Sequence, residues 1–324
     1  AGSSHLPVEG CPGHHRGGQQ HGVTLQALNF MSTHTRVPRA LVWCGLLLAQ
    51  LLPAALAYWL CACIAALLRR LQARMYRVLR HNLAHVAASD STASQLDAMA
   101  EQALALALRT YYESFRSTAT GGRWQVEMIV PTDCTLLRRD NGIESRGMMI
   151  CGLHIANFDA AGAWLAQHGI DVQVLSLANP DPGTEMINTL RRKQGLHITP
   201  VDPGALRAAI RRLRAGGLVL TGIDRPADGG NQPLTFFGET TAMPVGHVRL
   251  AMQAGVPVVL MACYQQAPGV YCLACSDPIK MQHTGDRSAD TSANATRLLA
   301  LAEVFIRKAP EQWLVFVPVW PPEA

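Results

Sequence analysis

The sequence predicts an α/β fold, with helices flanking a mostly parallel central sheet, behind an N-terminal hydrophobic membrane-anchoring helix. After about residue 125, short apolar runs alternate with helical stretches, which is typical of a parallel sheet with crossover helices. Residues 40–68 contain no charged side chain. Only 16% of the 324 residues are charged and 49% are hydrophobic, whereas about a quarter of a typical soluble domain is charged. This composition favours contact with a membrane.

The chain is expected to have three parts. Residues 1–37 are rich in Gly, His, Pro and Gln without periodicity, which predicts a disordered tail. Residues 38–90 would hold the membrane anchor and a basic amphipathic helix. Residues 91–324 are long enough to bury a substantial core, and we expect them to form one α/β domain.

The apolar segment 40–68 is the expected anchor. As a helix, its 29 residues exceed the hydrocarbon core of a bilayer, about 30 Å thick, so it would span with a tilt or with a kink at Pro53. The alternatives are a helical hairpin in one leaflet and a buried helix of the globular body. Five arginines follow within residues 69–80 but only Arg36 and Arg39 precede closely. If the segment spans, this excess places the C-terminal body in the cytoplasm.

Residues 69–86 are expected to continue as a basic amphipathic helix, with an apolar side opposite the arginines. Such a helix either lies at the level of the lipid headgroups or is an ordinary surface helix. The net charge of +5 is modest, and no interleaving of aromatic and basic residues accompanies the cluster. Nucleic acid is therefore not expected as a partner, and an anionic membrane surface is favoured.

The remaining elements follow from the periodicity of apolar residues. A further helix is expected near residues 93–115. Strands are expected near residues 125–130, 147–153, 172–177, 197–201, 217–223, 256–263, 270–276 and 313–319. Helices are expected near residues 158–168, 183–194, 203–215, 244–254 and 291–308.

The cysteines do not indicate a metal site. There are nine, and Cys272 with Cys275 form a single C-x-x-C in a predicted strand, without the second half that a zinc site requires. Scattered cysteines in an odd number favour a reduced, cytoplasm-facing protein.

The most informative motif is His154 followed by Asp159. An apolar run leads to the histidine, and the carboxylate follows five positions later at the start of an apolar helix. This spacing alone is weak, because His85 with Asp90 and His197 with Asp202 share it, and chance supplies about one such pair. Only at 154–159 does a predicted strand-to-helix turn fold the two side chains together.

We interpret His154 as a general base. Its neutral imidazole would take the proton of an acceptor hydroxyl as the oxygen attacks an acyl thioester, while Asp159 would hold the other ring nitrogen. Asn157 would cap the helix and lie near the reacting atoms. The alternative is structural: a histidine at a strand end, and an aspartate that favours the positive end of the helix dipole.

Two further groups of charged residues are candidates for substrate binding. Arg191, Arg192 and Lys193, near a helix end, would meet the phosphates of an acyl donor or a lipid, or would simply be solvated. Asp224 and Arg225 directly follow an apolar strand, at the end where open α/β sheets bind ligands. They would build the substrate side of the cleft or form a structural ion pair.

Phe236 and Phe237 would line an acyl-chain groove or pack in the core. The sequence lacks G-x-S-x-G, the P-loop pattern and H-E-x-x-H. Serine hydrolases, P-loop nucleotide hydrolases and zinc peptidases are therefore excluded, because each class requires its motif.

Taken in order, these blocks resemble the bacterial lipid A biosynthesis acyltransferase family, which includes lauroyl and myristoyl acyltransferases and phosphatidylinositol mannoside acyltransferases. The likeness covers about residues 40–320. It is carried by the hydrophobic segment with its basic helix and by five later blocks. These are the His154-to-Asp159 motif, Arg191-Arg192-Lys193-Gln194-Gly195, Asp224-Arg225, Phe236-Phe237-Gly238 with Pro244 and Gly246, and the segment from Gln312-Trp313 to Trp320.

The resemblance implies an acyltransferase-type fold and a membrane-bound O-acyltransferase on the cytoplasmic face of a bacterial inner membrane. The donor would be acyl-CoA or acyl carrier protein, the acceptor a hydroxyl of a glycolipid or lipid, and no metal or other cofactor is expected. It gives His154 and Asp159 the catalytic roles and places Asp224 and Arg225 in the cleft. A glycerophospholipid (lysophospholipid) acyltransferase and a catalytically silent, membrane-associated lipid-binding protein are the alternative functions.

Overall fold

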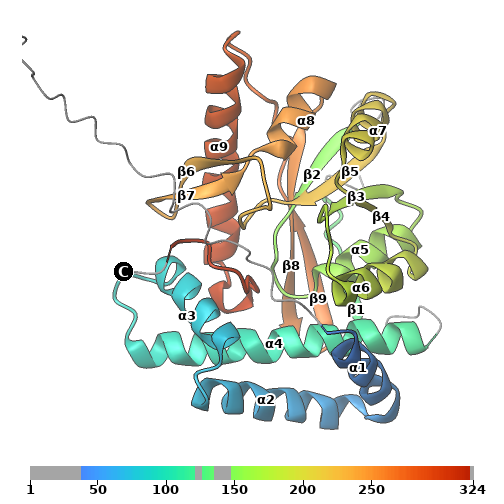
Figure 1. Cartoon of the computed structure of the whole chain (residues 1–324), viewed down its shortest axis with the longest axis vertical. Coiled ribbons are helices and arrows are strands. Elements are labelled where there is room, and N and C mark those ends of the chain that lie inside the picture. Colours follow the sequence, from blue (N-terminus) through green and yellow to red (C-terminus); the bar gives the residue numbers. More distant parts are fainter. Residues whose placement is uncertain (1–37, 121–125, 135–146, 322–324) are drawn as a thin grey trace, which may run out of the picture. The chain divides into compact units, whose positions relative to one another are not determined.

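The computed structural model describes residues 38–120, 126–134 and 147–321. The predicted tail at residues 1–37 lies outside these described residues. The fold is mixed α/β: a central sheet of seven strands is flanked by helices (Figure 1).

The apolar segment forms two helices rather than one. α1 (Arg39–Leu51) ends just before Pro53, and α2 (Ala54–Arg70) begins after it. A proline at this place ends a helix, because it has no N–H to donate and restricts the residue before it. Side chains of the next long helix satisfy the carbonyls that the break leaves free: Tyr112 donates to Leu52 O, and Arg116 donates to both Ala49 O and Leu52 O.

A second break separates α2 from the basic helix α3 (Arg74–Val86). It occurs at Gln72, whose φ of 48° is left-handed. Among the described residues no single helix is both long and apolar enough to cross a bilayer; α2 and α3 meet that standard only together, and they are bent by 85° at the break. The expected helix over residues 40–68 is therefore two helices divided at Pro53, where a kink was predicted.

The apolar side of α3 is buried in the protein, as in an ordinary surface helix. Tyr76, Leu79 and Leu83 are fully buried in the main core. Asn82 donates to Val315 O and Val317 O and accepts from Val319 N. α3 is thus an integral part of the body that carries the site.

The helix α4 (Ala93–Ala119) lies across one end of the central sheet, and α2 runs alongside it (Figure 1). It begins with a capping box, in which the Thr92 side chain accepts from Gln95 N and the Gln95 side chain accepts from Thr92 N. α4 therefore links the N-terminal helices to the strand ends.

The sheet has the order β1-β9-β8-β2-β5-β3-β4 and is parallel except between β8 and β9, which are antiparallel. The pairs β2–β5, β2–β8, β3–β5, β3–β4 and β1–β9 are parallel. The strands are β1 (Glu127–Ile129), β2 (Met148–Gly152), β3 (Val172–Ser176), β4 (His197–Pro200), β5 (Leu218–Gly222), β8 (Val258–Ala267) and β9 (Val270–Cys275). Seven of the eight expected strands are thereby confirmed.

Helices connect the parallel strands, which is the arrangement that the alternating pattern predicted. α8 contacts β2 and α7, and α9 contacts β8 and the small hairpin described next. The connecting helices are α5 (Phe158–Gln167), α6 (Pro182–Lys193), α7 (Pro203–Arg214) and α8 (Gly246–Ala254), whereas α9 (Arg287–Arg307) follows β9, the last strand of the sheet.

Two features differ from the prediction. β6 (Asn231–Phe236) and β7 (Glu239–Pro244) form a separate antiparallel hairpin that the sequence analysis did not predict. The predicted strand at 313–319 is absent; after a short 3-10 helix (Pro310–Gln312) the chain is irregular, with one bridge between Trp313 and Ile155. Trp313 and Trp320 are buried there in an aromatic cluster rather than paired in a sheet.

Candidate active site

The site is built where β2 and β5 end. The two strands are parallel neighbours with Gly152 opposite Gly222. His154 and Asp224 each follow two residues after their glycine, so the register brings them to the same place. Nδ1 of His154 lies 2.6 Å from Oδ1 of Asp224, and the backbone N–H of His154 donates to Oδ2 at 2.8 Å.

Asp224 is fully buried and accepts a third hydrogen bond, from Nε1 of Trp313 at 2.8 Å. Burial alone would raise the pKa of the Asp224 carboxyl, but the His154 ring and the hydrogen bonds from His154 and Trp313 outweigh it. The pKa of Asp224 consequently lies below its ordinary value, and the group is a carboxylate near neutral pH.

An ionised carboxylate only accepts hydrogen bonds, so Nδ1 of His154 carries the proton in this pair. The unprotonated nitrogen of the neutral ring is then Nε2. Nε2 has no hydrogen-bond partner among the described residues, and the side chain is 21% exposed. This arrangement leaves a basic lone pair available to a ligand.

Two neighbouring residues pack against the imidazole ring of His154. A Cβ at Gly222 would fall 2.8 Å from Cε1 of His154, so only glycine fits the ring here. Phe158 meets the imidazole edge to face, with ring centroids 5.2 Å apart. The ring orientation is therefore fixed by Asp224, by Gly222 and by Phe158.

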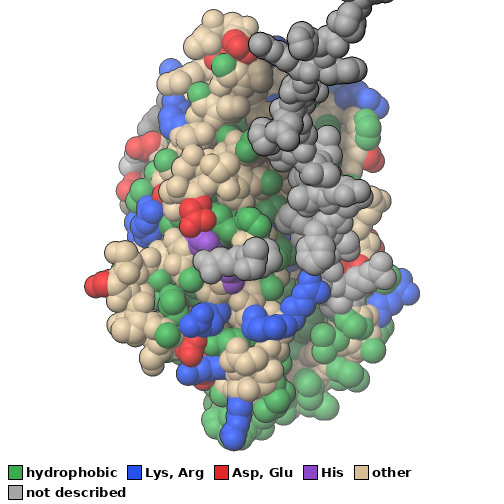
Figure 2. Space-filling view, turned by 60° about the vertical axis from the view of Figure 1, so that its left-hand side comes forward, with side chains coloured by type: hydrophobic (Ala, Val, Ile, Leu, Met, Phe, Trp, Pro, Cys, Tyr) green, Lys and Arg blue, Asp and Glu red, His purple; other side chains and the backbone are tan. Residues whose placement is uncertain are grey.

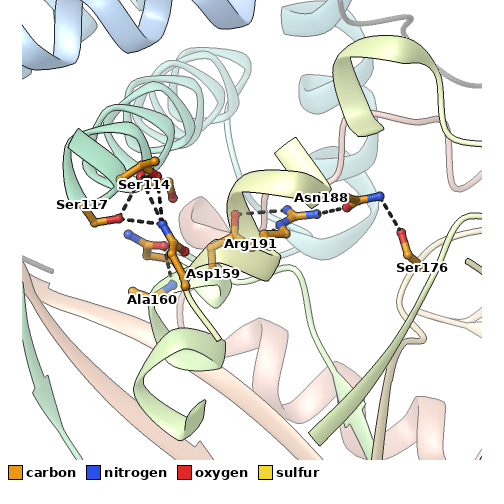
Figure 3. Close-up of polar contacts among 10 residues, drawn as sticks. Ser114, Ser117, Asp159, Ala160, Ser176, Asn188 and Arg191 are labelled. Carbon is orange, nitrogen blue, oxygen red and sulfur yellow. Dashed lines mark hydrogen bonds and ion pairs between the residues drawn. The ribbon is translucent and has the colours of Figure 1, made fainter. Parts of the chain in front are cut away.

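Asp159 is not the partner of His154. Its carboxylate forms a bidentate ion pair with Arg191 of α6, at 2.8 Å to Nε and 3.1 Å to Nη2 (Figure 3). The predicted His154–Asp159 pairing is wrong because the start of α5 directs Asp159 toward α6, while β5 supplies the carboxylate at the histidine. Arg191 also donates to Asn188 Oδ1, and Asn188 donates to Ser176 Oγ at the end of β3 (Figure 3).

A small pocket lies beside this ion pair. Besides Asp159 and Arg191, it is lined by residues of α4 and α6, including Tyr111, Phe115, Ile187 and Leu190. Phe115 and Ile187 also belong to the apolar cluster that α1 completes. The pocket thus has a charged wall and an apolar wall.

Asn157 caps α5, as predicted, by accepting from Ala160 N at 3.0 Å. Its amide nitrogen donates to Glu113 Oε2 at 2.6 Å, and the residue is 1% exposed. The side chain is buried and both of its polar ends have protein partners, so the expected contact between Asn157 and substrate stays a prediction.

Arg192 also differs from its expected role. It pairs with Glu185 at 2.7 Å and donates to Ile198 O beside β4. Its side chain thereby contacts its own helix and the edge strand β4. Lys193 is exposed.

Arg225 follows Asp224 directly and is partly buried. It has no acidic partner within ion-pair distance among the described residues. Burial lowers the pKa of Arg225, partly offset by the negative charges of Asp224 and Asp228; Tyr111 and Arg191 are also close enough to influence it. Arg225 and Arg191 therefore place two cationic side chains in the neighbourhood of Tyr111.

Phe236 is fully buried, with its ring stacked on Trp320 and edge to face with Trp313. Of the two roles expected for Phe236, packing in the core is the one that this burial matches. Phe237 is half-buried, at the hairpin turn, and lies under the Arg307 guanidinium at 4.6 Å. Both phenylalanines support Trp313, the residue that holds Asp224.

The comparison with known proteins agrees with the motif order. A family model described as bacterial lipid A biosynthesis acyltransferase matches residues 29–321. The chain belongs to this family. The resemblance inferred from the sequence is thereby confirmed.

Curated proteins similar to this lipid A acyltransferase family member include two named phosphatidylinositol mannoside acyltransferase. One, from Mycobacterium tuberculosis (strain CDC 1551 / Oshkosh), is 28% identical over 183 residues, 54% of each chain. The other, from Mycolicibacterium smegmatis, is 27% identical over 252 residues, 75% of this chain and 78% of the relative. The chain thus spans about half the length of the first relative. Family and relatives alike carry names that indicate an acyltransferase.

Three residues that contribute to the site of this family member were not predicted from the sequence. Trp313 donates to Asp224, Gly222 makes room for the imidazole, and Glu113 of α4 holds Asn157. The sequence did contain a signal for the pair of His154 and Asp224, here called the dyad: β2 and β5 both end in glycine, with the polar residue two positions later. No local signal could reveal Glu113, because its partners lie 44 to 158 residues away.

Proposed function

We propose that this chain is a membrane-bound O-acyltransferase that moves a fatty acyl group from acyl-CoA or acyl carrier protein to a hydroxyl of a glycolipid. The observation that carries the proposal is the 2.6 Å contact between His154 Nδ1 and Asp224 Oδ1, which leaves Nε2 without a protein partner in the described chain, on a side chain that is 21% exposed. A histidine held in this way is suited to general base catalysis.

In the proposed reaction, Nε2 of His154 takes the proton of the acceptor hydroxyl as its oxygen attacks the thioester carbonyl. The new ester C–O bond forms and the C–S bond breaks. The imidazolium then returns the proton to the departing thiolate. Asp224 orients the ring and stabilises its positive charge throughout, and no covalent acyl-enzyme is required.

The charged residues near the dyad support a donor or acceptor that carries phosphate. Arg225 has no acidic partner within ion-pair distance in the described chain, and Arg191 lies near Tyr111, which Arg225 also approaches. Guanidinium groups match phosphate oxygens in geometry and charge. We assign Arg225 to substrate binding, and Arg191 to holding Asp159 at the rim of the site.

The proposed acceptor is a phosphatidylinositol mannoside, because the relatives described above carry that substrate in their names. A sugar hydroxyl of such a lipid is an alcohol of the kind that a neutral histidine can deprotonate during attack. Its phosphate would suit the guanidinium group of Arg225.

The surface of the N-terminal helices supports binding to a bilayer. Ten of the thirteen most exposed large hydrophobic residues of the described chain lie between residues 41 and 71. Figure 2 shows hydrophobic side chains gathered at the lower end of the molecule, where Figure 1 places α1 and α2, with basic side chains just above. We name the ten the exposed apolar patch: Leu41, Trp43, Leu47, Leu48, Leu51, Leu56, Trp59, Ile64, Leu67 and Leu71.

Exposed apolar residues gathered in this way mark an interaction surface, and they fit the acyl region of one leaflet. Arg70, Arg74 and Arg77 are exposed at its edge and have no acidic partner among the described residues. They would meet anionic headgroups. We propose that the chain binds the inner membrane of a bacterium with its catalytic body facing the cytoplasm.

The deciding experiment incubates the purified full chain with a labelled fatty acyl-CoA and vesicles containing either phosphatidylinositol mannoside or a lysophospholipid. We expect label in the mannoside and a loss of about 10³-fold in the folded His154→Ala variant, within the range of general base effects. Label in the lysophospholipid alone would favour a glycerophospholipid acyltransferase. Transfer to neither lipid, or equal transfer by His154→Ala, would contradict the proposal.

A further inference from the structure

Glu113 is a buried carboxylate at the centre of four elements. It lies on α4, is 6% exposed, and accepts three hydrogen bonds. Tyr58 of α2 donates to Oε1 at 2.6 Å, and Tyr271 of β9 donates to Oε2 at 2.7 Å. Asn157, at the start of α5, also donates to Oε2, at 2.6 Å.

All three partners are donors, which matches a carboxylate, an acceptor-only group. Burial raises the pKa of Glu113, while the three hydrogen bonds and the charge of Arg109 oppose that rise. The Arg109 guanidinium lies 5.6 Å from the centre of the Tyr58 ring. A buried charge of this kind is costly, and its hydrogen bonds fix one geometry.

The hydrogen bond from Asn157 connects Glu113 to the turn that carries His154. Asn157 is three residues after His154, and between them Ala156 has a left-handed φ of 43°. A non-glycine residue in that conformation persists only where its surroundings hold it. The surroundings here are Glu113 on one side, and on the other Gln312 O, which accepts from Ala156 N, and Leu314 N, which donates to His154 O.

The hydrogen bond from Tyr58 connects Glu113 to α2, a helix at the surface. Tyr58 is on the inner side of α2, whereas its neighbours Leu56 and Trp59 are 44% and 61% exposed and belong to the exposed apolar patch. A continuous path of contacts therefore leads from the patch through Tyr58, Glu113 and Asn157 to the turn that carries His154.

We infer that Glu113 is a positioning residue through which lipid contact by α2 sets the geometry of the His154 turn. Lipid that immobilises α2 holds the Tyr58 hydroxyl on Oε1, and this restricts the Glu113 carboxylate and hence Asn157. Turnover then rises when the protein sits on a bilayer. The inference rests on the proposed function, but its structural part can be measured without turnover.

The chain offers a matched pair of variants. Tyr58→Phe and Tyr271→Phe each remove one hydroxyl that donates to the same carboxylate. Only Tyr58 belongs to a helix of the exposed apolar patch. A general loss of Glu113 support would affect both variants alike, whereas coupling to lipid is specific to Tyr58.

The first test is hydrogen exchange of a peptide covering residues 154–160, with and without vesicles of phosphatidylglycerol and phosphatidylcholine. In the wild type we expect vesicles to slow exchange there severalfold. Tyr58→Phe and Glu113→Gln should lose this slowing while still sedimenting with the vesicles, and Tyr271→Phe should keep it. Equal slowing in Tyr58→Phe and Tyr271→Phe, or no slowing in the wild type, would overturn the inference.

The second test measures acyl transfer. We expect vesicles to raise wild-type kcat about tenfold, since small misplacements of a catalytic group are costly, and Tyr58→Phe to lose most of that gain. Glu113→Gln should lower kcat with little change in the donor KM, because Glu113 does not touch the donor. A raised KM with unchanged kcat would contradict a positioning role. If the wild type transfers no acyl group, the proposed function fails, and the exchange test still decides the coupling.

Discussion

Gly222 lies against the imidazole of His154, so closely that a Cβ there would fall 2.8 Å from Cε1 of the ring. The same glycine pairs with Gly152 in the sheet, so one residue both belongs to the strand register and leaves room for the imidazole of His154. We expect Gly222→Ala to displace the imidazole and lower kcat by about 10- to 100-fold, as for comparable misplacements. Kinetics and thermal unfolding check this; an unchanged kcat would mean that the ring has another usable position.

The two carboxylates near His154 should differ in importance. We expect Asp224→Asn to lower kcat by about 10³- to 10⁴-fold, because the ring loses both its orientation and the charge that stabilises the imidazolium. Asp159→Asn should cost less. It should resemble Arg191→Gln, and the double variant should be no worse than either one, because the two residues form one ion pair. A double-mutant cycle on kcat measures this. Additive losses, or a greater loss at Asp159, would contradict the assignment.

We expect Trp313 to affect the acidic limb of the profile of kcat/KM against pH. Its indole N–H is one of the groups that hold the Asp224 pKa down. Trp313→Phe removes that donor, so the Asp224 pKa should rise and the acidic limb of the kcat/KM profile should move to higher pH. Because the folded pKa of Asp224 is depressed, its stabilising effect exists above about pH 3.9 and disappears as pH falls through the folded value. The variant should lose part of that stabilisation. A limb that does not move would refute the role of Trp313.

His247 of α8 should make the fold sensitive to acid. It is 2% exposed, neither ring nitrogen has a partner, and burial lowers its pKa from 6.5 to about 4. Between these values the unfolded chain binds the proton and the folded chain does not. Stability therefore falls by about 3 kcal/mol as pH decreases from 6.5 to 4. Chemical unfolding at several pH values checks this, and His247→Leu should show a smaller decline over that range.

Charge at the edge of the exposed apolar patch should control lipid binding. Reversing Arg70, Arg74 and Arg77 to Glu should weaken sedimentation with anionic vesicles by at least tenfold at low salt, since each basic residue contributes about 1 kcal/mol near such a surface. The matched control reverses Arg207, Arg211 and Arg214 of α7, all three of which are likewise exposed without an acidic partner within the described chain. Equal loss in both variants would indicate a general charge effect.

Deletion of residues 1–86 is not a suitable test of anchoring. It would remove α3, whose Asn82 binds the backbone at Val315, Val317 and Val319 and whose apolar side is buried. Loss of membrane binding by that variant could follow from unfolding alone. Surface substitutions separate the two effects.

Periodicity predicted the parallel strands because their buried apolar runs are local features. It failed for segments whose conformation is determined by tertiary packing. Trp313–Val319 resembles a strand in composition, but Trp313 and Trp320 are buried in an aromatic cluster instead. The β6–β7 hairpin contains Pro233 within a strand and turns at Phe237 and Gly238, both with positive φ. Gly238 is an ordinary residue for such a turn, but phenylalanine rarely adopts that conformation and proline is unusual within a strand, so a hairpin was not predicted here.

His154 and Asp224 were each recognised from their positions after apolar strands, but their pairing was not. That pairing depends on β2 lying beside β5, which is a property of the strand order and not of any local spacing. The five-residue spacing to Asp159 suggested the wrong partner, because it took no account of Arg191 on the neighbouring helix.

The bonds of Asn82 join residues more than 230 positions apart, and they fasten the segment that brings Trp313 to Asp224. Contacts of such long range form late. During synthesis on the ribosome, the helices of the exposed apolar patch emerge long before Trp313 does. We therefore expect the nascent chain to reach lipid first and to acquire a complete dyad only after nearly all of it has been translated.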